Sequence, residues 1–284
     1  MQTTTRTAVL CVLLAGVVCT AHAETINCTP ITSLPAVITV QGIYCFTGHL
    51  NTGMTSGNAI EIQTNNVALD LNGWKLGRQA GGIGTQAAGI HAFQRKNITI
   101  RNGTIRGFYQ GIWIEDTSPY TTSSGHLVED MHLDANTWIG IRVEGSGNIV
   151  RRNQVVNTGG SPLADNTAGI DLFGPGARVL DNDVSEVVLG TADPNGTAFG
   201  INLNFADDAA VVGNRVGKSN TAFGNGVSIN TAVNVLLLGN QLLGKWSYGL
   251  VVSDVFAGGK CRDNFFSAGV TYPLFNCANV ANNN

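Results

Sequence analysis

The amino-acid sequence predicts an all-β solenoid of about nine stacked coils, each built from three short strands. Two observations predict it. A strand-like motif, in which Gly is followed by two apolar positions alternating with variable ones, recurs seven times at spacings of 22 to 31 residues. Between these motifs, short apolar runs repeatedly end in Asn. One such period cannot bury its own apolar face, so the periods must stack to form a continuous core.

The composition agrees with a β-rich protein and excludes several other classes. The 284-residue chain contains 36 Gly and 29 Asn, with 43% hydrophobic and only 12% charged residues. A coiled coil needs Ala, Glu, Lys and Leu in bulk, and a disordered chain has few apolar residues. The net charge of −3 provides no basic surface for nucleic acid. We therefore expect no nucleic-acid partner.

The recurring Gly motif alternates core and exposed positions with a period of two, which is typical of a β-strand. The expected strands are residues 89–93, 111–115, 140–144, 169–173, 200–204, 226–230 and 249–253. Their variable spacing places insertions in the loop before each strand. The longest of these loops are expected at residues 158–167 and 186–198.

The recurring Asn predicts a ladder that runs through the stack. Its expected members are Asn72, Asn102, Asn153, Asn182, Asn214, Asn240 and Asn264, with Asp130 in the slot of the remaining coil. A polar side chain at one repeated position can hydrogen-bond to its copies above and below. On this alignment His132, two residues after Asp130, takes a core position.

The N-terminus resembles a secretory signal covering residues 1–23. Arg6 supplies the positive charge, the apolar run 8–18 is too short to span a bilayer, and Ala21-His22-Ala23 fits a cleavage site. No later segment is long and apolar enough to cross a membrane. The mature chain is therefore expected to begin at Glu24, to be secreted or periplasmic, and to have no membrane contact after cleavage.

Four cysteines remain after signal cleavage, and an even number in an exported protein suggests disulfides. Three pairings are possible, and the local pairs Cys28–Cys45 and Cys261–Cys277 are favoured. A metal site is the alternative, but no Cys-x-x-Cys spacing supports it. Residues 24–58 are expected to form an N-terminal cap and first coil, residues 59–268 the repeats, and residues 269–284 a C-terminal cap and tail.

From about residue 36 to residue 268, these repeats resemble the right-handed parallel β-helix proteins of the pectate-lyase-like superfamily, which share the pectin lyase fold. That superfamily contains lyases, hydrolases, epimerases, phage tailspikes and adhesins, so the resemblance implies a fold without naming one activity. It also implies that the strand after the variable loop, here the Gly-motif strand, lines the substrate groove.

Strand alternation arranges the outward residues of the Gly-motif strands in two columns. The first column is His91, Trp113, Arg142, Asp171, Asn202, Ser228 and Val251; the second is Phe93, Glu115, Glu144, Phe173, Asn204, Asn230 and Ser253. Because coils stack about 4.8 Å apart, neighbours in a column touch. We expect an exposed sugar-binding face, with Trp113 as a stacking platform and Arg142, Glu115, Glu144, Asn202 and Asn204 as polar contacts. The alternative is a solvated face with cross-strand ion pairs, such as Arg142 between Glu115 and Asp171.

The lyase chemistry of the superfamily requires a base, a cation that neutralises a uronate carboxylate, and an acid. The candidate catalytic residues are His91 as base, Arg142 as neutralising cation, and Asp171. Glu115 and Glu144, one coil apart, are also candidate Ca²⁺ ligands. The alternative for this pair is that Arg142 neutralises both carboxylates.

The motif of polygalacturonase-like hydrolases is incomplete here. Ala168 stands where those enzymes carry Asp in Asn-Thr-Asp-Gly, and no Gly-His-Gly follows. Two functions therefore remain open. One is an exported protein that binds, and as a lyase or C5-epimerase modifies, an acidic uronate-containing polysaccharide. The other is a non-catalytic carbohydrate-binding or surface-structural β-helix.

Overall fold

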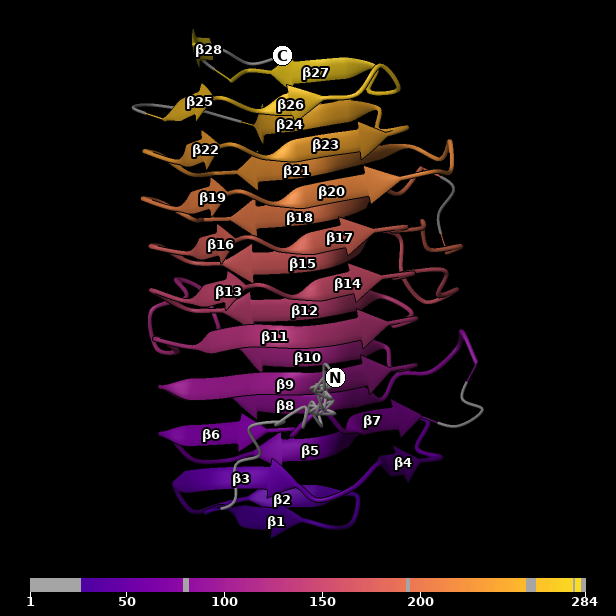
Figure 1. The fold of residues 1–284 in the computed structure, drawn as a ribbon, viewed down its shortest axis with the longest axis vertical. Helices are drawn as coiled ribbons and strands as arrows, with labels where there is room; N and C mark the ends of the chain where they lie inside the picture. The colour runs from indigo at the N-terminus through magenta and orange to yellow at the C-terminus, as the bar shows by residue number, and fades with distance from the viewer. Residues whose placement is uncertain (1–26, 79–81, 193–194, 254–258, 278, 282–284) are drawn as a thin grey trace, which may run out of the picture.

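The computed structural model describes residues 27–78, 82–192, 195–253, 259–277 and 279–281. Every regular element of these residues is a β-strand, and the strands stack as parallel layers along one axis (Figure 1). The predicted all-β parallel solenoid is confirmed. The predicted secretory signal lies outside the described residues. None of the described residues forms a helix that is long and apolar enough to cross a membrane.

One strand of nearly every coil belongs to a ten-stranded parallel sheet that contains all of the expected Gly-motif strands. Its members are β2 (Ala36–Ile38), β5 (Asn58–Ile62), β8 (Ala88–Phe93), β10 (Gln110–Glu115), β12 (Ile139–Glu144), β15 (Thr167–Phe173), β18 (Ala198–Asn204), β21 (Gly224–Asn230), β24 (Tyr248–Ser253) and β27 (Tyr272–Phe275).

The remaining strands form an eighteen-stranded sheet on the opposite side of the core. The strands that come first in each coil are β1 (Thr29–Ile31), β3 (Gly42–Phe46), β6 (Val67–Asp70), β9 (Ile98–Arg106), β11 (Leu127–Asp134), β13 (Ile149–Arg151), β16 (Arg178–Leu180), β19 (Ala210–Val212), β22 (Leu236–Leu238), β25 (Lys260–Arg262) and β28 (Asn279–Ala281). The strands that come second are β4 (Leu50–Thr52), β7 (Lys75–Arg78), β14 (Gln154–Val156), β17 (Asp183–Ser185), β20 (Arg215–Lys218), β23 (Gln241–Gly244) and β26 (Phe265–Phe266). The long strands β9 and β11 span both positions, since β9 pairs with β6 and β7, and β11 with β13 and β14.

The core lies between the two sheets and consists of the inward residues of the alternation. Ile141 and Val143 of β12, and Ile170 and Leu172 of β15, are completely buried. The same holds for the equivalent pairs of β8, β10, β18, β21 and β24. The strand periodicity predicted from the Gly motif is therefore confirmed.

The repeated Gly has a packing cause. A Cβ atom added to Gly169 would lie 2.4 Å from Val184 Cγ1 across the core and 2.8 Å from the carbonyl oxygen of Gly200 in the next coil. The other six glycines of the motif meet a backbone carbonyl of the next coil at 2.5 to 2.8 Å in the same way. No side chain fits at this position, so the motif marks where a strand lies too close to the next coil of its own sheet, and to core side chains, for a Cβ atom.

The Asn ladder is confirmed for five of its members. Asn153, Asn182, Asn214, Asn240 and Asn264 are buried, and each Nδ2 of the first four donates to Oδ1 of the next at 2.9 to 3.0 Å. The same Oδ1 atoms accept backbone N–H groups, as when Asn153 N donates to Asn182 Oδ1 at 3.0 Å. Each member thus satisfies buried backbone groups of the preceding coil, as Asn182 does by accepting from Asn153 N and donating to the Val150 carbonyl.

The ladder prediction is wrong by one residue for Asp130 and for Asn102, which lies opposite Asp130 in the register of β9 and β11. Asn72 Nδ2 donates to the Phe46 carbonyl at 3.1 Å. Asp130 is exposed and has a positive φ of 53°, the conformation that Arg152 and Asp181 adopt immediately before ladder members Asn153 and Asn182. The next residue, Met131, occupies the ladder position in this coil, because its N–H donates to Asn153 Oδ1 at 3.0 Å. Short polar residues suit both the position with positive φ and the ladder position that follows it. The residue type alone therefore does not show which of the two positions an Asn or Asp occupies.

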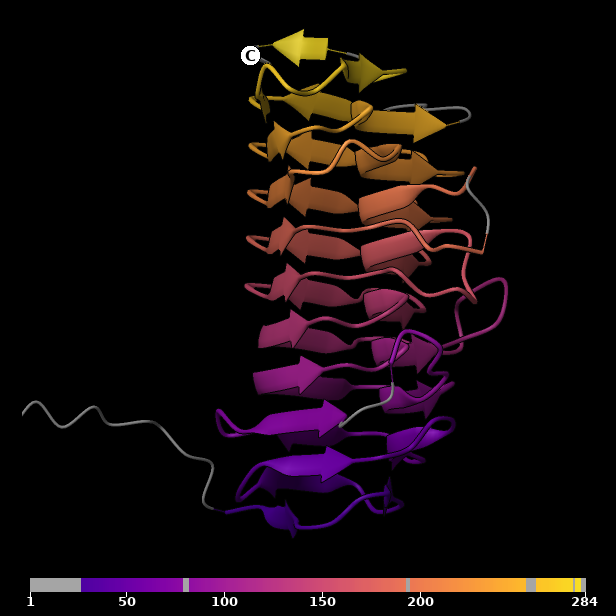
Figure 2. The same ribbon diagram turned by 90° about the vertical axis from the view of Figure 1, so that its right-hand side faces the viewer.

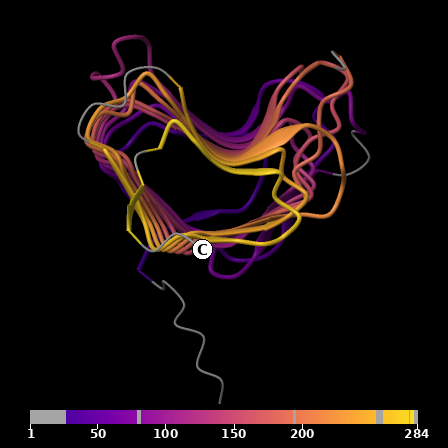
Figure 3. The ribbon, with the colours of Figure 1, turned by 90° about the horizontal axis from the view of Figure 1, so that it is seen from above.

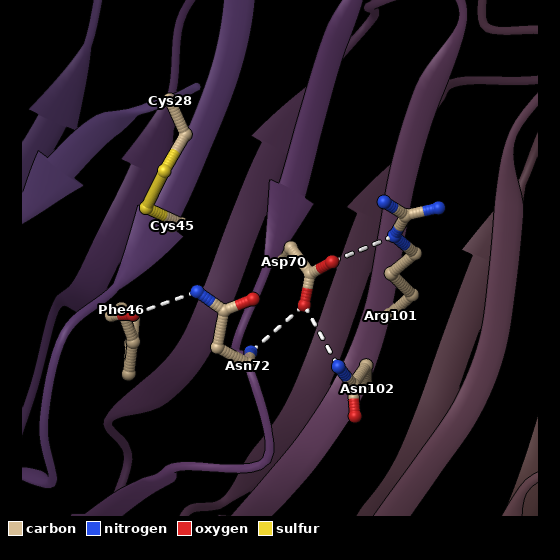
Figure 4. The surroundings of a disulfide bond; sticks show 7 residues. All are labelled: Cys28, Cys45, Phe46, Asp70, Asn72, Arg101 and Asn102. Carbon is tan, nitrogen blue, oxygen red and sulfur yellow. Dashed lines mark hydrogen bonds and ion pairs between the residues drawn. A yellow bond between two sulfur atoms is a disulfide. The ribbon is translucent and has the colours of Figure 1, made fainter. Parts of the chain in front are cut away.

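The same one-residue shift corrects the position of His132. His132 pairs with Gln154 and points outward, whereas Leu133 pairs with Val155 and is buried. The expectation of a core histidine is wrong. In the early coils, Asn72 and Asn102 instead surround Asp70, whose carboxylate accepts bonds from Asn72 N, Asn102 Nδ2 and Arg101 Nε (Figure 4).

Both predicted disulfides are confirmed. Cys28 is bonded to Cys45, and their Cα atoms are 5.8 Å apart; Cys261 is bonded to Cys277 with a Cα separation of 6.1 Å. Cys28 lies just before β1 and Cys45 lies in β3, and these two strands also pair with each other (Figure 4). Each disulfide therefore fastens one end of the stack.

The longer loops project on the side of the ten-stranded sheet (Figure 2), which curves inward when the stack is seen from above (Figure 3). Viewed down the stack, one group of loops precedes the strands of this sheet and the other, which includes the loop between β10 and β11, follows them (Figure 3). The outward face of the ten-stranded sheet thus lies between two sets of loops.

Candidate functional site

A pocket of about 310 Å³ lies on the outward face of the ten-stranded sheet, over β12, β15, β18 and β21. We call it the polar pocket. Its polar lining includes Arg142, Asp171, Asn202, Asn204 and Asn230, and its aromatic lining includes Trp138, Phe173 and Phe199. A concave site with a few convergent polar groups among aromatic rings is the usual form of a small-ligand site.

Arg142 and two carboxylates form the charged centre of the polar pocket. Arg142 Nε donates to Glu144 Oε1 at 2.5 Å, and Arg142 Nη1 lies 3.6 Å from Asp171 Oδ2. Glu144 also accepts the backbone N–H of Asp116 at 2.9 Å, from the coil below. The guanidinium is therefore held between two acidic groups, and four-fifths of the Arg142 side chain is buried.

Amide side chains of the next two coils extend this centre. Asn202 Nδ2 donates to Asp171 Oδ1 at 2.9 Å, and Asn230 Nδ2 donates to Asn202 Oδ1 at 2.9 Å and to Asn204 Oδ1 at 3.2 Å. Strand register causes this arrangement, because Asp171, Asn202 and Ser228 lie opposite one another on β15, β18 and β21. The result is a continuous polar network from Glu144 to Asn230.

Burial changes the acidity of both carboxyl groups. Burial raises the pKa of Asp171 to about 6, although the Arg142 guanidinium and the Asn202 amide oppose this effect. Burial likewise raises the pKa of Glu144 against the opposing charge of Arg142. Asp171 can therefore gain or lose a proton in mildly acidic solution, which suits a group that transfers protons.

Aromatic rings form the walls around the charged centre. Cζ of Arg142 lies 4.7 Å from the centroid of Phe173 and 5.8 Å from that of Trp138. Trp138 stacks on Tyr109 with a centroid distance of 4.7 Å, and Trp138 Nε1 donates to the carbonyl of Asn166 at 2.7 Å. Trp138 is thus fixed in orientation at the side of the pocket where the strands begin.

The loop between β10 and β11 brings Tyr120 to the other side of the pocket. The Tyr120 ring lies 5.2 Å from Phe173 and 5.6 Å from Phe205 between centroids. Burial and the nearby Glu144 carboxylate raise the pKa of the Tyr120 phenol, and Arg142 lowers it. Tyr120 is therefore within electrostatic reach of the charged centre although it comes from a different coil.

His91 belongs to a separate cluster lower in the stack. His91 Nδ1 lies 2.9 Å from Glu61 Oε2, and His91 Nε2 lies 3.0 Å from Glu115 Oε2. Both ring nitrogens can donate to these carboxylates only if the ring is protonated, and a protonated ring cannot accept a further proton. Asn58 Nδ2 also lies 3.2 Å from His91 Nδ1, so both ring nitrogens face neighbouring side chains, and a role as base requires His91 to leave one of them.

Trp113 separates the His91 cluster from the polar pocket. Its ring lies 4.6 Å from the His91 ring between centroids, and its Nε1 is buried with no hydrogen-bond partner among the described residues. Trp113 is half-buried rather than an open stacking platform, and Glu144 and Asp171 are buried as well. The expected columns are therefore confirmed in register, but the expectation that these three residues lie on a fully exposed face is wrong.

Glu115 and Glu144, the pair proposed to bind Ca²⁺, have different partners. Glu115 contacts His91, whereas Glu144 binds Arg142 and the Asp116 N–H. Among the residues that the structure describes, no group of three or more His, Cys, Asp or Glu side chains is placed to hold a metal ion. Binding of Ca²⁺ by this pair requires the cation to displace His91 and Arg142 from the two carboxylates.

The structure brings together Arg142, Glu144, Asp171, Asn202 and Asn204 of the residues predicted from sequence, and it leaves His91, Trp113 and Glu115 outside the pocket. The sequence analysis missed Trp138, Phe199 and Tyr120 as site residues. Phe199 pairs with Ala168, so it belongs to an outward column just before the repeated Gly. Tyr120 lies in a loop without periodicity, and no sequence signal indicates it.

Comparisons with known proteins support the fold. A tailspike protein 2 domain of bacteriophage CBA120, described as enzymatically active, has a TM-score of 0.53 at 16% identity and matches 84% of this chain. The chain spans 38% of the length of that domain. The A-module of a mannuronan C-5 epimerase from Azotobacter vinelandii matches 81% of this chain and 87% of its own, but with a TM-score of 0.38 at 11% identity. At 16% identity the likeness to the tailspike domain concerns the fold alone.

A catalytic domain of an α-1,3-glucanase in complex with nigerose covers 90% of this chain and 63% of its own, with a TM-score of 0.40 at 13% identity. A search of curated protein sequences finds no match. The family described as right handed beta helix region matches residues 36–186, more than half of the chain. Together with the stacked parallel coils, this match shows that the chain belongs to the right-handed β-helix family.

Proposed function

We propose that the protein binds a polysaccharide on the outward face of its ten-stranded sheet, with one sugar residue in the polar pocket. The observation that carries the proposal is the pocket itself, which combines a guanidinium, a carboxyl group and four amides with the rings of Trp138 and Phe173. Aromatic faces cover the apolar faces of sugar rings, and planar polar groups bond to sugar hydroxyls. The pocket has the size of a site for one small polar ligand.

The sugar is a uronate in this proposal, because Arg142 is the cation that lines the pocket. A uronate carboxylate entering the pocket competes with Asp171 and Glu144 for Arg142. Protonation of Asp171, whose pKa burial raises to about 6, removes one of these competitors. We therefore expect binding of an acidic polysaccharide to strengthen as the pH falls through about 6.

The reaction that the pocket suits is proton transfer next to the uronate carboxylate, as in β-elimination or C5-epimerisation. Arg142 stabilises the negative charge that develops on the carboxylate, as expected of a preorganised cation. Asp171 contacts Arg142 and titrates in mild acid, so it is better placed than His91 to carry the proton. His91 remains a candidate base only if it leaves Glu61 or Glu115.

A second candidate function is carbohydrate binding without turnover. The observation that favours it is the pairing of every charged group at the site: Arg142 with Glu144, Asp171 with Asn202, and His91 with two glutamates. A fully paired network is rigid and suits recognition, whereas a catalytic base needs a free lone pair aimed at the substrate. The exported location proposed for the chain fits both candidates, since disulfides persist in oxidising compartments.

The experiment is a binding screen combined with a turnover assay. Affinity electrophoresis against polygalacturonate, alginate and a neutral glucan at pH 5 and pH 8 should show retardation by an acidic polymer, stronger at pH 5. Absorbance of unsaturated ends and NMR of the C5 proton then separate elimination, epimerisation and binding without turnover. Failure to bind any of the polymers at either pH would remove the proposal.

A further inference from the structure

A second pocket, of about 480 Å³, lies beside the polar pocket, beyond the ends of β15, β18 and β21. We call it the apolar pocket. Pro119, Tyr120, Pro175, Phe205 and Val233 supply most of its lining. Ser118, Asp207 and Thr231 add polar atoms. Its size is that of a site for a second small ligand group.

The two pockets are adjacent along the strand direction. Three successive coils each contribute to both: Phe173 lines the polar pocket and Pro175 the apolar one, Asn204 is followed by Phe205, and Asn230 by Thr231. The step from one pocket to the other therefore follows the strand direction, not the stacking axis. A ligand that fills both pockets crosses the sheet edge at β15, β18 and β21.

The loop between β10 and β11 builds the wall that divides the pockets. The Asp116 carboxylate accepts the backbone N–H groups of Thr117, Thr122 and Ser123 at 2.9 to 3.0 Å. These bonds close the loop around its own first residue and fix Tyr120 against Phe173 and Phe205. Since Phe173 lines the polar pocket and Tyr120 and Phe205 line the apolar one, the three rings form the shared wall.

The chemistry of the two pockets differs. The polar pocket presents a charged centre, whereas the apolar pocket presents proline rings, aromatic faces and Val233 without a cation among its lining residues. Burying a sugar hydroxyl in such a lining without a hydrogen-bond partner weakens binding, because the hydroxyl loses its water. Burying a methyl group there strengthens binding. Asp207 and Thr231 remain available at the lining for the hydroxyls of the same residue.

We propose that the apolar pocket binds a methyl-bearing sugar residue of the polysaccharide, either a 6-deoxyhexose or an acetylated sugar, next to the residue in the polar pocket. The inference rests on the proposed function and specifies its ligand. The shared chemistry of the two sources is a single methyl group on a polar ring. The protein then selects a polysaccharide in which a polar or acidic residue adjoins a methyl-bearing one.

The test compares sugars that differ at one substituent, by titration of the full chain followed by NMR. L-Fucose against L-galactose examines the 6-deoxy methyl, and N-acetyl-D-glucosamine against N-formyl-D-glucosamine examines the acetyl methyl. One of the two pairs should show an affinity about fourfold higher for the methyl-bearing member, as expected for burial of one methyl group. The pair that shows the preference identifies the source of the methyl.

The variants locate the preference. Phe205→Ala should abolish it, while Phe265→Ala should leave it unchanged, because Phe265 is equally exposed (49% against 48%) but lies on the eighteen-stranded sheet. If Phe205→Ala does not fold, Val233→Thr is the replacement, since it keeps the side-chain shape and adds a hydroxyl to the lining.

Equal or unmeasurable affinities within both pairs overturn the inference, and so does a preference that survives in Phe205→Ala. If an acidic polymer still binds in either case, the proposed function stands and only the methyl site is wrong. If neither the polymers nor the sugars bind, both proposals are wrong.

Discussion

Arg142 and Asp171 lie opposite each other on the adjacent strands β12 and β15, with Arg142 Nη1 3.6 Å from Asp171 Oδ2. The same Arg142 donates to Glu144 two residues further along its own strand. One cation is therefore shared by two buried carboxyl groups, Asp171 in the lining of the polar pocket and Glu144 next to it. This shared cation links the acidity of Asp171 to the charge that the pocket offers to a ligand.

The first prediction concerns the glycine motif. Gly169→Ala should lower the free energy of unfolding by about 2 kcal/mol, because overpacking forces the backbone or Val184 to shift. Gly217→Ala is the control, since a Cβ at Gly217 would meet nothing within 4 Å. Thermal unfolding followed by circular dichroism compares them. Equal midpoints for the two variants would show that the motif glycine is not required by packing.

The second prediction concerns the ladder. Asn182→Leu removes the acceptor of Asn153 N and the donor to the Val150 carbonyl, both buried. Each unsatisfied buried group costs about 1–3 kcal/mol, so the midpoint of urea unfolding should fall clearly. Gln154→Leu, at an exposed amide of β14, should change it little. An Asn182→Leu protein as stable as wild type would place the ladder in contact with solvent.

The third prediction concerns His126, whose pKa burial lowers to about 4. Its ring accepts the Ile98 N–H at Nδ1 and contacts Ser123 Oγ through Nε2 at 2.8 Å, so the neutral form fits the site. As the pH falls from about 6.5, the unfolded chain gains the proton first, and stability contributed by neutral His126 is lost by about pH 4. The loss should reach about 3 kcal/mol across this range.

Asp171 has the opposite linkage in the same range, so variants are needed to separate the two groups. Its folded pKa of about 6 lies above the ordinary value of 3.8, and it therefore contributes stability that is lost as the pH rises through about 6. His126→Gln should flatten the acid loss, whereas His132→Gln, at a half-exposed position, should not. Identical pH profiles for wild type and His126→Gln would contradict the assignment.

The fourth prediction concerns the pH dependence of binding. Asp171→Asn mimics the protonated carboxyl group, so it should bind an acidic polysaccharide at pH 8 about as strongly as wild type does at pH 5. The wild-type affinity should fall between these pH values, because ionised Asp171 competes for Arg142. Asp183→Asn removes an exposed carboxylate paired with Arg215 on the other sheet and is the control. A wild-type affinity independent of pH would refute the competition.

The sequence predicts the fold well because the packing constraint is local and repeated. Gly169 and its equivalents admit no side chain, and the residues that follow them alternate between core and surface, so the pattern survives in the sequence. The ladder is harder to place, because Asp130 and Asn153 are both short polar residues. One adopts a positive φ before the ladder, and the other belongs to it.

The site is only partly predictable for a related reason. Register places Arg142 beside Asp171, and strand alternation is sufficient to expect this pair. Burial of Asp171 and Glu144 depends on Trp138, Phe173 and Tyr120, and Tyr120 comes from a loop of irregular length. The pairing of His91 with Glu61 depends on β5, a strand that lacks the Gly motif. Neither loop placement nor this partner has a periodic signal.

Calorimetry measures whether Arg142 binds a uronate in the polar pocket. An oligogalacturonate or oligomannuronate selected in the screen is titrated at pH 5 into wild type, Arg142→Gln and Arg215→Gln. Arg215 pairs with Asp183 on the opposite sheet and matches Arg142 in chemistry. Arg142→Gln should weaken binding at least tenfold, which corresponds to about 1.4 kcal/mol. Loss of a hydrogen bond to a charged group has an effect of about this size or larger. Arg215→Gln should bind with the affinity of wild type. Equal affinities for wild type and Arg142→Gln would contradict uronate binding through Arg142.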